Sequence, residues 1–455
     1  MPSPDLIRTS APFLPLLGKE LRDLFAGRAL WALLLLLSPL VGYSFIQAVS
    51  LYAEASRPAA QFPELARGLS PFDGIEVPTL GALYLATTLL FPFIAIRTIG
   101  AEKQNGGLKL LLQMPYSIPE LIGTKLLTLL VAWLLALIPC LSALAIWLAL
   151  GGHLGAGETL NLLLGHLLYM LVITGISLFA ASLTDNGATA AIMTLAFTIG
   201  FWVLDFAAAG QGGAVQAIAT LSLTAILRGF EQGIFSLAIL AATVAAAVGL
   251  LALAGLWLPP GLAIRHKLVF SMLVIATATF VMFGAAQLHV YGDVTEDRRN
   301  SFPLPGANAL ASLGGRLTVI VNLSAKDPRF MDFDRSLLGK LRRTVPDVRV
   351  VVTSGRSSLF NTGDDTYGLI AYQYDGREAS SRSTSPEEVL PLIYGLAGID
   401  PPKSDAEETY PGYPLVVDAT NAGSWFYVAL PLLLLVAWAL QSGLPRRARQ
   451  ILARK

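Results

Sequence analysis

Long apolar stretches are the sequence feature that most restricts how this chain can fold. A helix that crosses a lipid bilayer needs roughly 20 predominantly apolar residues. Eight stretches approach or exceed that length: 29–50, 78–98, 122–150, 159–183, 187–205, 234–258, 268–288 and 424–441. The chain is only 14% charged, whereas soluble domains carry about 25% charged residues. The sequence therefore predicts an α-helical polytopic membrane protein with about eight transmembrane helices.

Lysines and arginines in the short connecting segments predict the orientation of these spans. If the N-terminus is cytoplasmic, the inside segments hold fifteen such residues. The short outer loops then hold three, Arg57, Arg67 and Arg228. Because cytoplasmic loops carry an excess of Lys and Arg, we expect both termini to lie in the cytoplasm.

The composition changes between the seventh and eighth spans, in residues 289–423. Charged residues, serines and prolines return there, and apolar runs at 317–323 and 348–352 predict buried strands. Residues 337–343 and 387–396 have helical patterns. Strands that alternate with helices are typical of a small α/β domain. An inserted extracytoplasmic α/β domain is therefore predicted.

The sequence lacks the motifs of several enzyme classes. It contains no G-x-x-x-x-G-K-[ST] phosphate loop, no G-x-S-x-G and no H-E-x-x-H, so P-loop ATP hydrolysis and these hydrolytic sites are excluded. A net charge of +1 argues against nucleic acid as a partner. The predicted span interiors hold almost no ionisable side chains, which disfavours proton-driven transport. We expect no catalytic, cofactor or metal site in this chain.

Residues 97–125, RTIGAEKQNGGLKLLLQMPYSIPELIGTK, form the most distinctive connecting segment. An irregular polar start is predicted from Gly100, Glu102, Gly106 and Gly107. A short apolar helix over 108–112 and a break at Pro115 and Pro119 follow. Composition alone leaves two interpretations open, a docking piece for a cytosolic partner or a loop that only fits the lipid headgroups.

This segment resembles the loop between the second and third spans of the type-2 ABC exporter permease family, which reads R…GE…G…LL…P.S…E…GK. The matching residues are, in order, Arg97, Glu102, Gly107, Leu111, Leu112, Pro115, Ser117, Glu120 and Lys125. Ala101, before Glu102, departs from the pattern. Residues 13–27 resemble the family's amphipathic elbow helix, and residues 221–233 its outer half-helices. The resemblance covers about 10–258.

The resemblance implies a non-enzymatic permease subunit of an ABC transporter, in the bacterial cytoplasmic (inner) membrane and in contact with its lipid. It implies a homodimer above a dimer of cytosolic ABC ATPase subunits, with ATP and magnesium bound in that partner and no cofactor in this chain. Export is the implied direction. The implied ATPase-docking residues are Arg97, Glu102, Gly107, Leu111, Leu112 and Pro115 in the loop, with Lys19 and Glu20 in the elbow.

A second resemblance begins after the seventh span. Residues 289–302, HVYGDVTEDRRNSF, are similar to the start of the gliding-motility ABC transporter auxiliary family. The residues that match are Asp293, Thr295, Asp297, Arg299 and Ser301. This resemblance implies a permease fused to a shortened auxiliary domain, which contacts an extracytoplasmic protein partner.

Two other functions stay open on sequence alone. One is an ATPase-coupled membrane anchor or mechanotransmission complex, similar to gliding motility, that moves no solute. The other is a receptor or assembly factor whose ligand site uses Arg356, Asp364, Asp365 and Arg377. The ordinary interpretation of these four side chains is a solvated loop face, since exposed charges are the default.

The predicted organisation has six parts. They are a cytoplasmic amphipathic elbow at 1–28, a six-helix ABC permease domain at 29–258, a cytoplasmic loop with the seventh span at 259–288, the extracytoplasmic α/β domain at 289–423, the eighth span at 424–441 and a basic cytoplasmic tail at 442–455.

The charge asymmetry generates a topology prediction. Single-cysteine reporters placed at 340 and 380 should react with a membrane-impermeant thiol reagent in intact cells, and a reporter at 105 should react only after permeabilisation. The reason is that the eight-span order places 289–423 outside and the 97–125 loop inside. Labelling of the 105 reporter in intact cells, with protection at 340, would reverse the assigned orientation.

Overall fold

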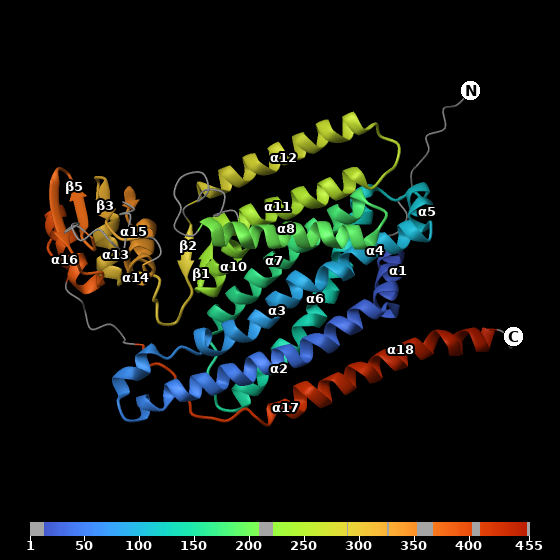
Figure 1. Ribbon diagram of the computed structural model, residues 1–455, viewed down its shortest axis with the longest axis horizontal. Coiled ribbons are helices and arrows are strands. Elements are labelled where there is room, and N and C mark those ends of the chain that lie inside the picture. Colours follow the sequence, from blue (N-terminus) through green and yellow to red (C-terminus); the bar gives the residue numbers. More distant parts are fainter. Residues whose placement is uncertain are drawn as a thin grey trace, which may run out of the picture. The chain divides into compact units, whose positions relative to one another are not determined.

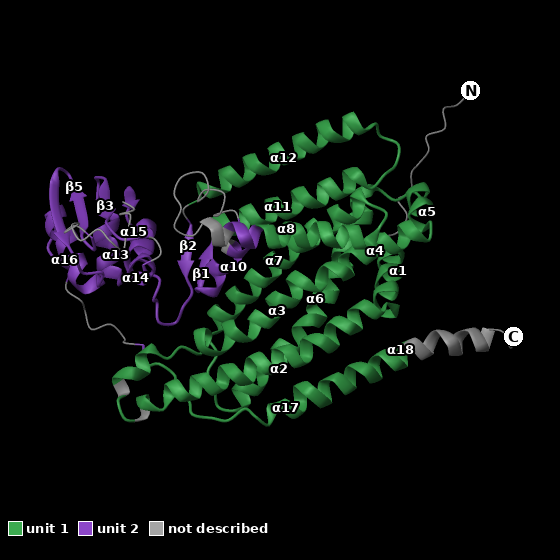
Figure 2. Ribbon diagram, in the orientation of Figure 1, with its two compact units in different colours: residues 1–200, 238–288, 411–455 green, residues 201–237, 289–410 purple. Residues whose placement is uncertain are grey.

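The computed structural model describes residues 13–208, 222–288, 290–324, 327–352, 367–402 and 410–452. Over these residues the protein is mostly helical, with a small mixed sheet (Figure 1). The chain divides into two units (Figure 2). Unit 1 comprises 1–200, 238–288 and 411–455, and unit 2 comprises 201–237 and 289–410. The predicted fold class, a helical polytopic membrane protein with a small α/β domain, is confirmed.

The long helices belong to unit 1, except that the last residues of α8 are grouped with unit 2. Within the described part of the chain, eight helical stretches are long and apolar enough to cross a membrane: 28–56, 72–104, 118–149, 156–183, 187–204, 237–257, 264–286 and 422–441. The helices are α1 (Phe13–Ala26), α2 (Arg28–Ser56), α3 (Val77–Leu89), α4 (Phe91–Gln104), α5 (Gly107–Gln113), α6 (Ile118–Ala149), α7 (Ala156–Leu183), α8 (Gly187–Ala208), α11 (Leu237–Trp257), α12 (Ile264–Ala286), α17 (Ala422–Ser424) and α18 (Leu430–Leu452). Short turns of other helix types are η1 (Pro58–Ala60), η2 (Pro63–Gly68), η3 (Phe72–Glu76) and η5 (Trp425–Ala429).

Two local expectations were wrong. Gly100 and Glu102 are not in an irregular segment, because α4 continues to Gln104 and only then turns. The sixth span does not begin at 234, since residues 234–236 form a short strand and α11 starts at Leu237. Apolar composition identified the region of the sixth span but not its boundary, because hydrogen bonding of 234–236 to a distant strand leaves no local signal.

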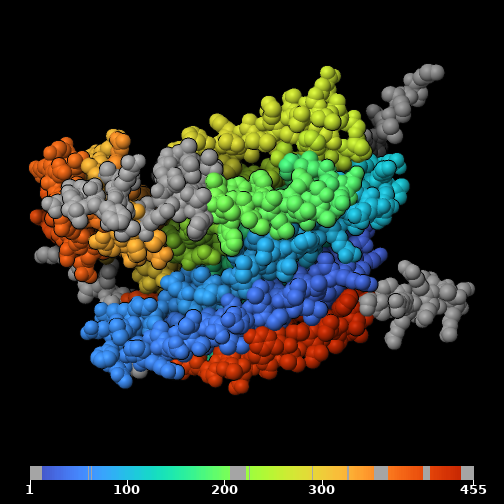
Figure 3. All heavy atoms as spheres, in the orientation of Figure 1, coloured from blue at the N-terminus to red at the C-terminus, as the bar shows by residue number. Residues whose placement is uncertain are grey.

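The last span packs on the first. The Ser38 hydroxyl in α2 donates to the carbonyl of Phe426 at 2.7 Å. Gly42 lies one turn further along α2, where an added Cβ would stand 2.3 Å from the Cβ of Phe426. Only glycine therefore permits this approach. Figure 3 shows the last span, in red, lying along α2, in blue. Residues 422–441 are thus an integral part of the helix bundle of unit 1.

Unit 2 is built around a four-stranded sheet. Its elements are α10 (Leu223–Glu231), β1 (Ile234–Ser236), β2 (Tyr291–Asp293), α13 (Leu304–Ala311), β3 (Leu317–Val321), α14 (Pro328–Phe333), η4 (Asp334–Leu338), α15 (Gly339–Thr344), β4 (Val348–Val352), β5 (Ile370–Tyr374), β6 (Arg377–Ser381) and α16 (Pro386–Ala397). The predicted strands at 317–323 and 348–352 are β3 and β4. The helical pattern at 337–343 lies in η4 and α15, and the one at 387–396 lies in α16.

The sheet has the order β4-β3-β5-β6. β3 and β4 are parallel, which requires the crossover made by α14, η4 and α15. β5 and β6 form an antiparallel hairpin around Asp375 and Gly376, both with positive φ, as a two-residue hairpin turn demands. Alternate residues of β3, among them Val319, are fully buried. The core of this sheet lies entirely between Phe302 and Leu396.

The residues that carry the second resemblance form a folded turn after β2. Asp293 accepts hydrogen bonds from the backbone N–H and hydroxyl of Thr295, from the backbone N–H of Asn300 at 2.9 Å and from the Ser301 hydroxyl at 2.8 Å. β2 itself pairs with β1. The motif therefore has a structural role, which is to reverse the chain after the β1–β2 ribbon.

The alternative ligand site of unit 2 is only partly within the described residues. Arg356, Asp364 and Asp365 lie outside them. Arg377 begins β6, and its Nη1 donates to the carbonyl of Leu396 at 3.3 Å, so this guanidinium joins the sheet to the end of α16. Arg377 thereby has a packing role.

The closed core of unit 2 generates a folding prediction. Residues 300–402, expressed alone, should fold, because every fully buried member of that core lies within this range. Thermal unfolding followed by circular dichroism should be cooperative. Val319→Asp should abolish the transition, since burying an unpaired charge costs several kcal/mol, while Ser380→Asp, on the exposed side of an edge strand, should not. A wild-type fragment without a cooperative transition would contradict the prediction.

Candidate functional site

The elbow helix α1 has one buried face. Leu16, Glu20 and Leu24 are buried and follow each other at intervals of four residues, which places them on a single stripe of the helix. The helix ends at Gly27, whose N–H bonds the carbonyls of Asp23 and Leu24, and α2 begins at the next residue. α1 packs on the start of α6. The amphipathic elbow expected from the resemblance is therefore present as a helix.

A buried ammonium group lies where α1, α4 and α6 meet. Lys125 in α6 is fully buried. Its Nζ donates to the Glu102 carboxylate at 2.7 Å, to the Glu20 carboxylate at 3.2 Å and to the carbonyl of Thr98 at 2.8 Å. An ammonium has three donors, and all three are used. Glu20 and Glu102 are themselves buried, so this one cation joins three helices.

Lys19 extends the network toward the surface. Its ammonium contacts Glu102, donates to Glu20 at 3.1 Å and pairs with Asp23 at 3.3 Å. Burial alone lowers the pKa of Lys19, but the hydrogen bond to Glu102 and the two neighbouring carboxylates raise it above its ordinary value. The pKa of Glu20 is raised, first by burial and also by the charge of Glu102, against the opposing effect of Lys125. The positive charge of Lys19 is therefore held at the edge of the cluster at neutral pH.

A tight turn separates α4 from the short helix α5. Gly106 adopts a φ of 75°, a conformation that glycine reaches without strain. The Asn105 side chain accepts the N–H of Gly107 at 2.8 Å. Along α5, Leu108 is buried, whereas Leu110 is 62% exposed. The short apolar helix predicted for this segment is present, and one of its sides is uncovered.

The next helix begins with a complete capping box. The Ser117 hydroxyl accepts the backbone N–H of Glu120, and the Glu120 carboxylate accepts the N–H of Ser117 at 2.7 Å. Pro119 stands within the first two positions of α6, where a missing N–H costs no helical hydrogen bond. Pro119 therefore belongs to a helix start, while Pro115 precedes it in an exposed turn.

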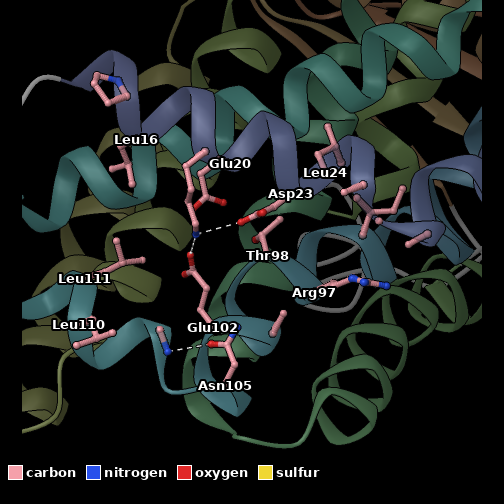
Figure 4. Close-up of a pocket in the computed structure, with 18 of the residues that line it drawn as sticks. Leu16, Glu20, Asp23, Leu24, Arg97, Thr98, Glu102, Asn105, Leu110 and Leu111 are labelled. Atoms are coloured by element: carbon pink, nitrogen blue, oxygen red, sulfur yellow. Dashed lines mark hydrogen bonds and ion pairs between the residues drawn. The ribbon is translucent and has the colours of Figure 1, made fainter. Parts of the chain in front are cut away.

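α1, α4 and α5 together enclose a pocket of about 660 Å³. In Figure 4, Glu20 and Asp23 of α1 face Glu102 of α4, and Leu110 and Leu111 of α5 lie beside them. Met114, which is 50% exposed, and Arg97 also line the pocket. The pocket combines an apolar wall with charged groups at its rim, which is typical of a surface that receives a protein helix or loop.

The structure places the eight residues expected at a docking site in two groups. Six line the pocket or its rim: Lys19, Glu20, Arg97, Glu102, Gly107 and Leu111. Leu112 packs partly against the core of the spans, and Pro115 lies in the exposed turn after α5. Because Glu20 and Glu102 are buried in contacts within the chain, the groups open to a partner are Lys19, Arg97, Leu110 and Leu111.

Several residues that line the pocket were not assigned to docking from the sequence. Among them are Asp23, Leu110 and Met114, which match no position of the family pattern. Asp23 carried a usable signal, since it follows Lys19 by four residues and such pairs meet on a helix surface. Leu110 and Met114 carried none, because their exposure depends on which side of α5 packs against α4.

Four buried ionisable residues, Glu76, Glu102, Lys125 and Glu158, lie near the ends of the long helices. His166 in α7 is also buried. No group of three or more His, Cys, Asp or Glu side chains in the described parts of the chain is arranged to hold a metal ion.

The family comparison agrees with this architecture. The ABC-2 family of transporter proteins matches residues 14–325. The chain belongs to this family. The match begins at the elbow helix of the ABC-2 protein, includes the pocket and the first seven spans, and continues into the sheet of unit 2. No curated protein and no solved structure gave a match. Membership makes the chain a membrane component of an ABC transporter. Members of the ABC-2 family are typically non-catalytic.

The buried network generates a stability prediction for the ABC-2 protein. Lys125→Ala should lower its free energy of unfolding by about 3–5 kcal/mol, because removing one partner leaves buried carboxylates uncompensated. Denaturant unfolding of the detergent-purified chain measures the loss. Lys109→Ala removes an exposed lysine from α5 and should leave stability within about 0.5 kcal/mol of the wild type.

A double variant separates charge from packing. Lys125→Met combined with Glu102→Gln should lose less stability than the two single losses added together, since contacting residues are energetically coupled. Additive losses would show that Lys125 and Glu102 contribute independently and would contradict the network.

Proposed function

We propose that this protein is the permease subunit of an ATP-driven ABC exporter and that a separate ABC ATPase subunit docks in the pocket between α1, α4 and α5. The ATPase would bind ATP and magnesium. The observation that carries the proposal is the uncovered side of α5, next to the charged rim formed by α1 and α4. Family membership supports an ABC ATPase as the partner.

The pocket has the chemistry of a protein interface. Leu110 and Met114 provide exposed apolar surface, and desolvated apolar side chains supply much of the binding energy at interface centres. Lys19, Asp23 and Arg97 surround them with both signs of charge, which would orient a partner. A projecting loop or helix of an ATPase subunit fits a pocket of about 660 Å³.

The buried network would couple docking to the spans. Lys125 joins the elbow to α4 and α6, so a force on α1 reaches two membrane helices without passing through a flexible loop. Lys103 adds a further link, because its ammonium donates to the carbonyls of Ser182 and Thr184 at the end of α7. An ATPase can shift the permease between two states only if it binds them with different affinity.

The remaining parts of the proposal concern assembly and location. The chain would form a homodimer in the bacterial inner membrane with both termini in the cytoplasm, as the charge asymmetry predicts. Residues 289–423 would lie outside and contact an extracytoplasmic protein. The similarity of residues 289–302 to the gliding-motility auxiliary family supports a fused, shortened auxiliary domain there. Nucleic acid has no role.

The alternative is a membrane anchor or mechanotransmission complex that uses ATP and moves no solute. The same docking pocket serves both functions, so docking experiments do not distinguish them. Reconstituted vesicles do, because an exporter concentrates a solute in an ATP-dependent manner and an anchor does not. ATP hydrolysis that depends on this chain without any solute flux would favour the anchor.

The docking proposal predicts the effect of one charge on α5. Leu110→Asp should reduce co-purification of a co-expressed ABC ATPase subunit by at least about tenfold, since losing a central apolar anchor costs about 2 kcal/mol or more. Gln113→Asp is the matched control, because Gln113 is exposed on the same helix but does not line the pocket. The quantity measured is the ATPase retained per tagged permease in detergent.

Leu110→Asp should also remain folded, since the Leu110 side chain is already 62% exposed. Retention of the ATPase at the wild-type level by a folded Leu110→Asp protein would remove this pocket as the docking site. Equal losses for Leu110→Asp and Gln113→Asp would show a general effect of negative charge on α5 and would equally contradict the proposal.

A further inference from the structure

A second groove lies at the other end of the spans. It has a volume of about 530 Å³ and is formed by the end of α6 and by residues 418–425. We refer to it as the α6–α17 groove, defined by Ser142, Ala145, Ile146, Leu150, Asp418, Ala419, Asn421, Ala422 and Trp425. α6 rises 1.5 Å per residue, so the groove is roughly 40 Å from the pocket beside α5. It therefore lies where α6 and the last span leave the bilayer.

The walls of the α6–α17 groove are held in place. The indole N–H of Trp425 donates to the Ser142 hydroxyl at 3.1 Å, which joins the two walls directly. Behind Trp425, Phe426 is anchored on α2 by the bond from Ser38. The preceding chain is also attached, because the Tyr52 hydroxyl donates to the carbonyl of Tyr413 at 2.7 Å. The groove is thus preformed, which limits the ordering that a ligand must bring about.

Most of the groove is apolar, and the charged side chain that lines it is acidic. Ala145, Ile146, Leu150 and Trp425 provide the apolar lining. Asp418 and Asn421 are exposed at its edge. Among the described residues that line the groove, none is Lys, Arg or His. Its charge is therefore negative, and it favours a cationic group beside an apolar chain.

Asp418 keeps its charge at neutral pH. The side chain and backbone N–H of Thr420 both bond its Oδ1, and these hydrogen bonds lower the pKa of Asp418 below its ordinary value. Both bonds use one oxygen, so they do not occupy Oδ2. A carboxylate of this kind binds a primary ammonium by a charge-assisted hydrogen bond.

We propose that the α6–α17 groove binds one phospholipid with a primary ammonium headgroup, of the phosphatidylethanolamine class. One acyl chain would lie against Ala145 and Ile146, and the ammonium would bond Asp418. A Trp side chain at the groove fits this position, since Trp is enriched at the membrane–water interface. Anionic lipids are disfavoured because Asp418 repels their headgroups, and choline lipids because a quaternary ammonium has no N–H to donate.

The bound lipid would brace the last span against α6. Trp425 is the single side chain that bonds across the groove in the part of the chain described here, and a lipid would fill the space beside it. This inference is independent of ATPase docking, since the two sites share no residue.

Native mass spectrometry of the detergent-purified full chain tests the proposal. Dioleoyl phosphatidylethanolamine, phosphatidylcholine and phosphatidylglycerol are added separately at equal concentration. The wild type should retain one phosphatidylethanolamine per chain, about tenfold more tightly than either other lipid, as loss of one charge-assisted hydrogen bond predicts. Equal retention of the three lipids by the wild type would overturn the proposal.

Two variants with matched controls locate the site. Asp418→Asn keeps the oxygen that Thr420 bonds but removes the charge, and it should abolish the preference for phosphatidylethanolamine. Glu378→Gln removes an exposed charge from β6 and should keep the preference.

Ala145→Phe fills the groove from an exposed position and should reduce retention of phosphatidylethanolamine about tenfold. Ala149→Phe is exposed one turn later and lies outside the groove, so it should not reduce retention. Wild-type preference in Asp418→Asn would refute the proposal whatever Ala145→Phe shows.

Discussion

The end of the spans that carries the elbow helix α1 depends on one buried ammonium group, that of Lys125. Its three hydrogen bonds end on α1, on α4 and on the backbone of α4 at Thr98. Taking a charge out of water is costly unless every donor finds an acceptor, and here the cost is offset only when the three helices are assembled. The network is consequently specific to a single arrangement of the elbow, the second span and the third span. The same network forms a rigid base for the pocket beside α5.

Much of the fold could be predicted because it depends on local composition. The eight spans follow from apolar length, and β3 and β4 follow from short runs of β-branched residues. β5 and β6 were not identified, although Asp375-Gly376 between them is a strong hairpin signal. The pairing of β1 with β2 joins residues 234–236 to residues 291–293. A contact over that distance has no signature in either segment.

The candidate site was accessible to sequence reasoning only in part. The family resemblance identified Glu20, Glu102 and Lys125 as members of two separate motifs. That they meet in one cluster depends on contacts between residues 105 and 23 positions apart. The exposure of Leu110 depends on the side of α5 that turns inward, which the φ of Gly106 determines. The return segment before the last span offered no motif at all, and its attachment to α2 became clear only from the hydrogen bond between the Tyr52 hydroxyl and the carbonyl of Tyr413.

The contact between α2 and Phe426 has a consequence for the order of assembly. Ser38 and Phe426 are separated by 388 residues, and a ribosome adding about 5–20 residues per second needs roughly 20–80 s to cover that distance. During this time α2 is already in the membrane, and its surface at Gly42 is covered only by lipid or by an insertion factor. The first span is therefore synthesised first, but its packing contact with Phe426 forms last. Release of an unfinished chain would leave the surface of α2 at Gly42 without the Phe426 side chain that covers it in the folded protein.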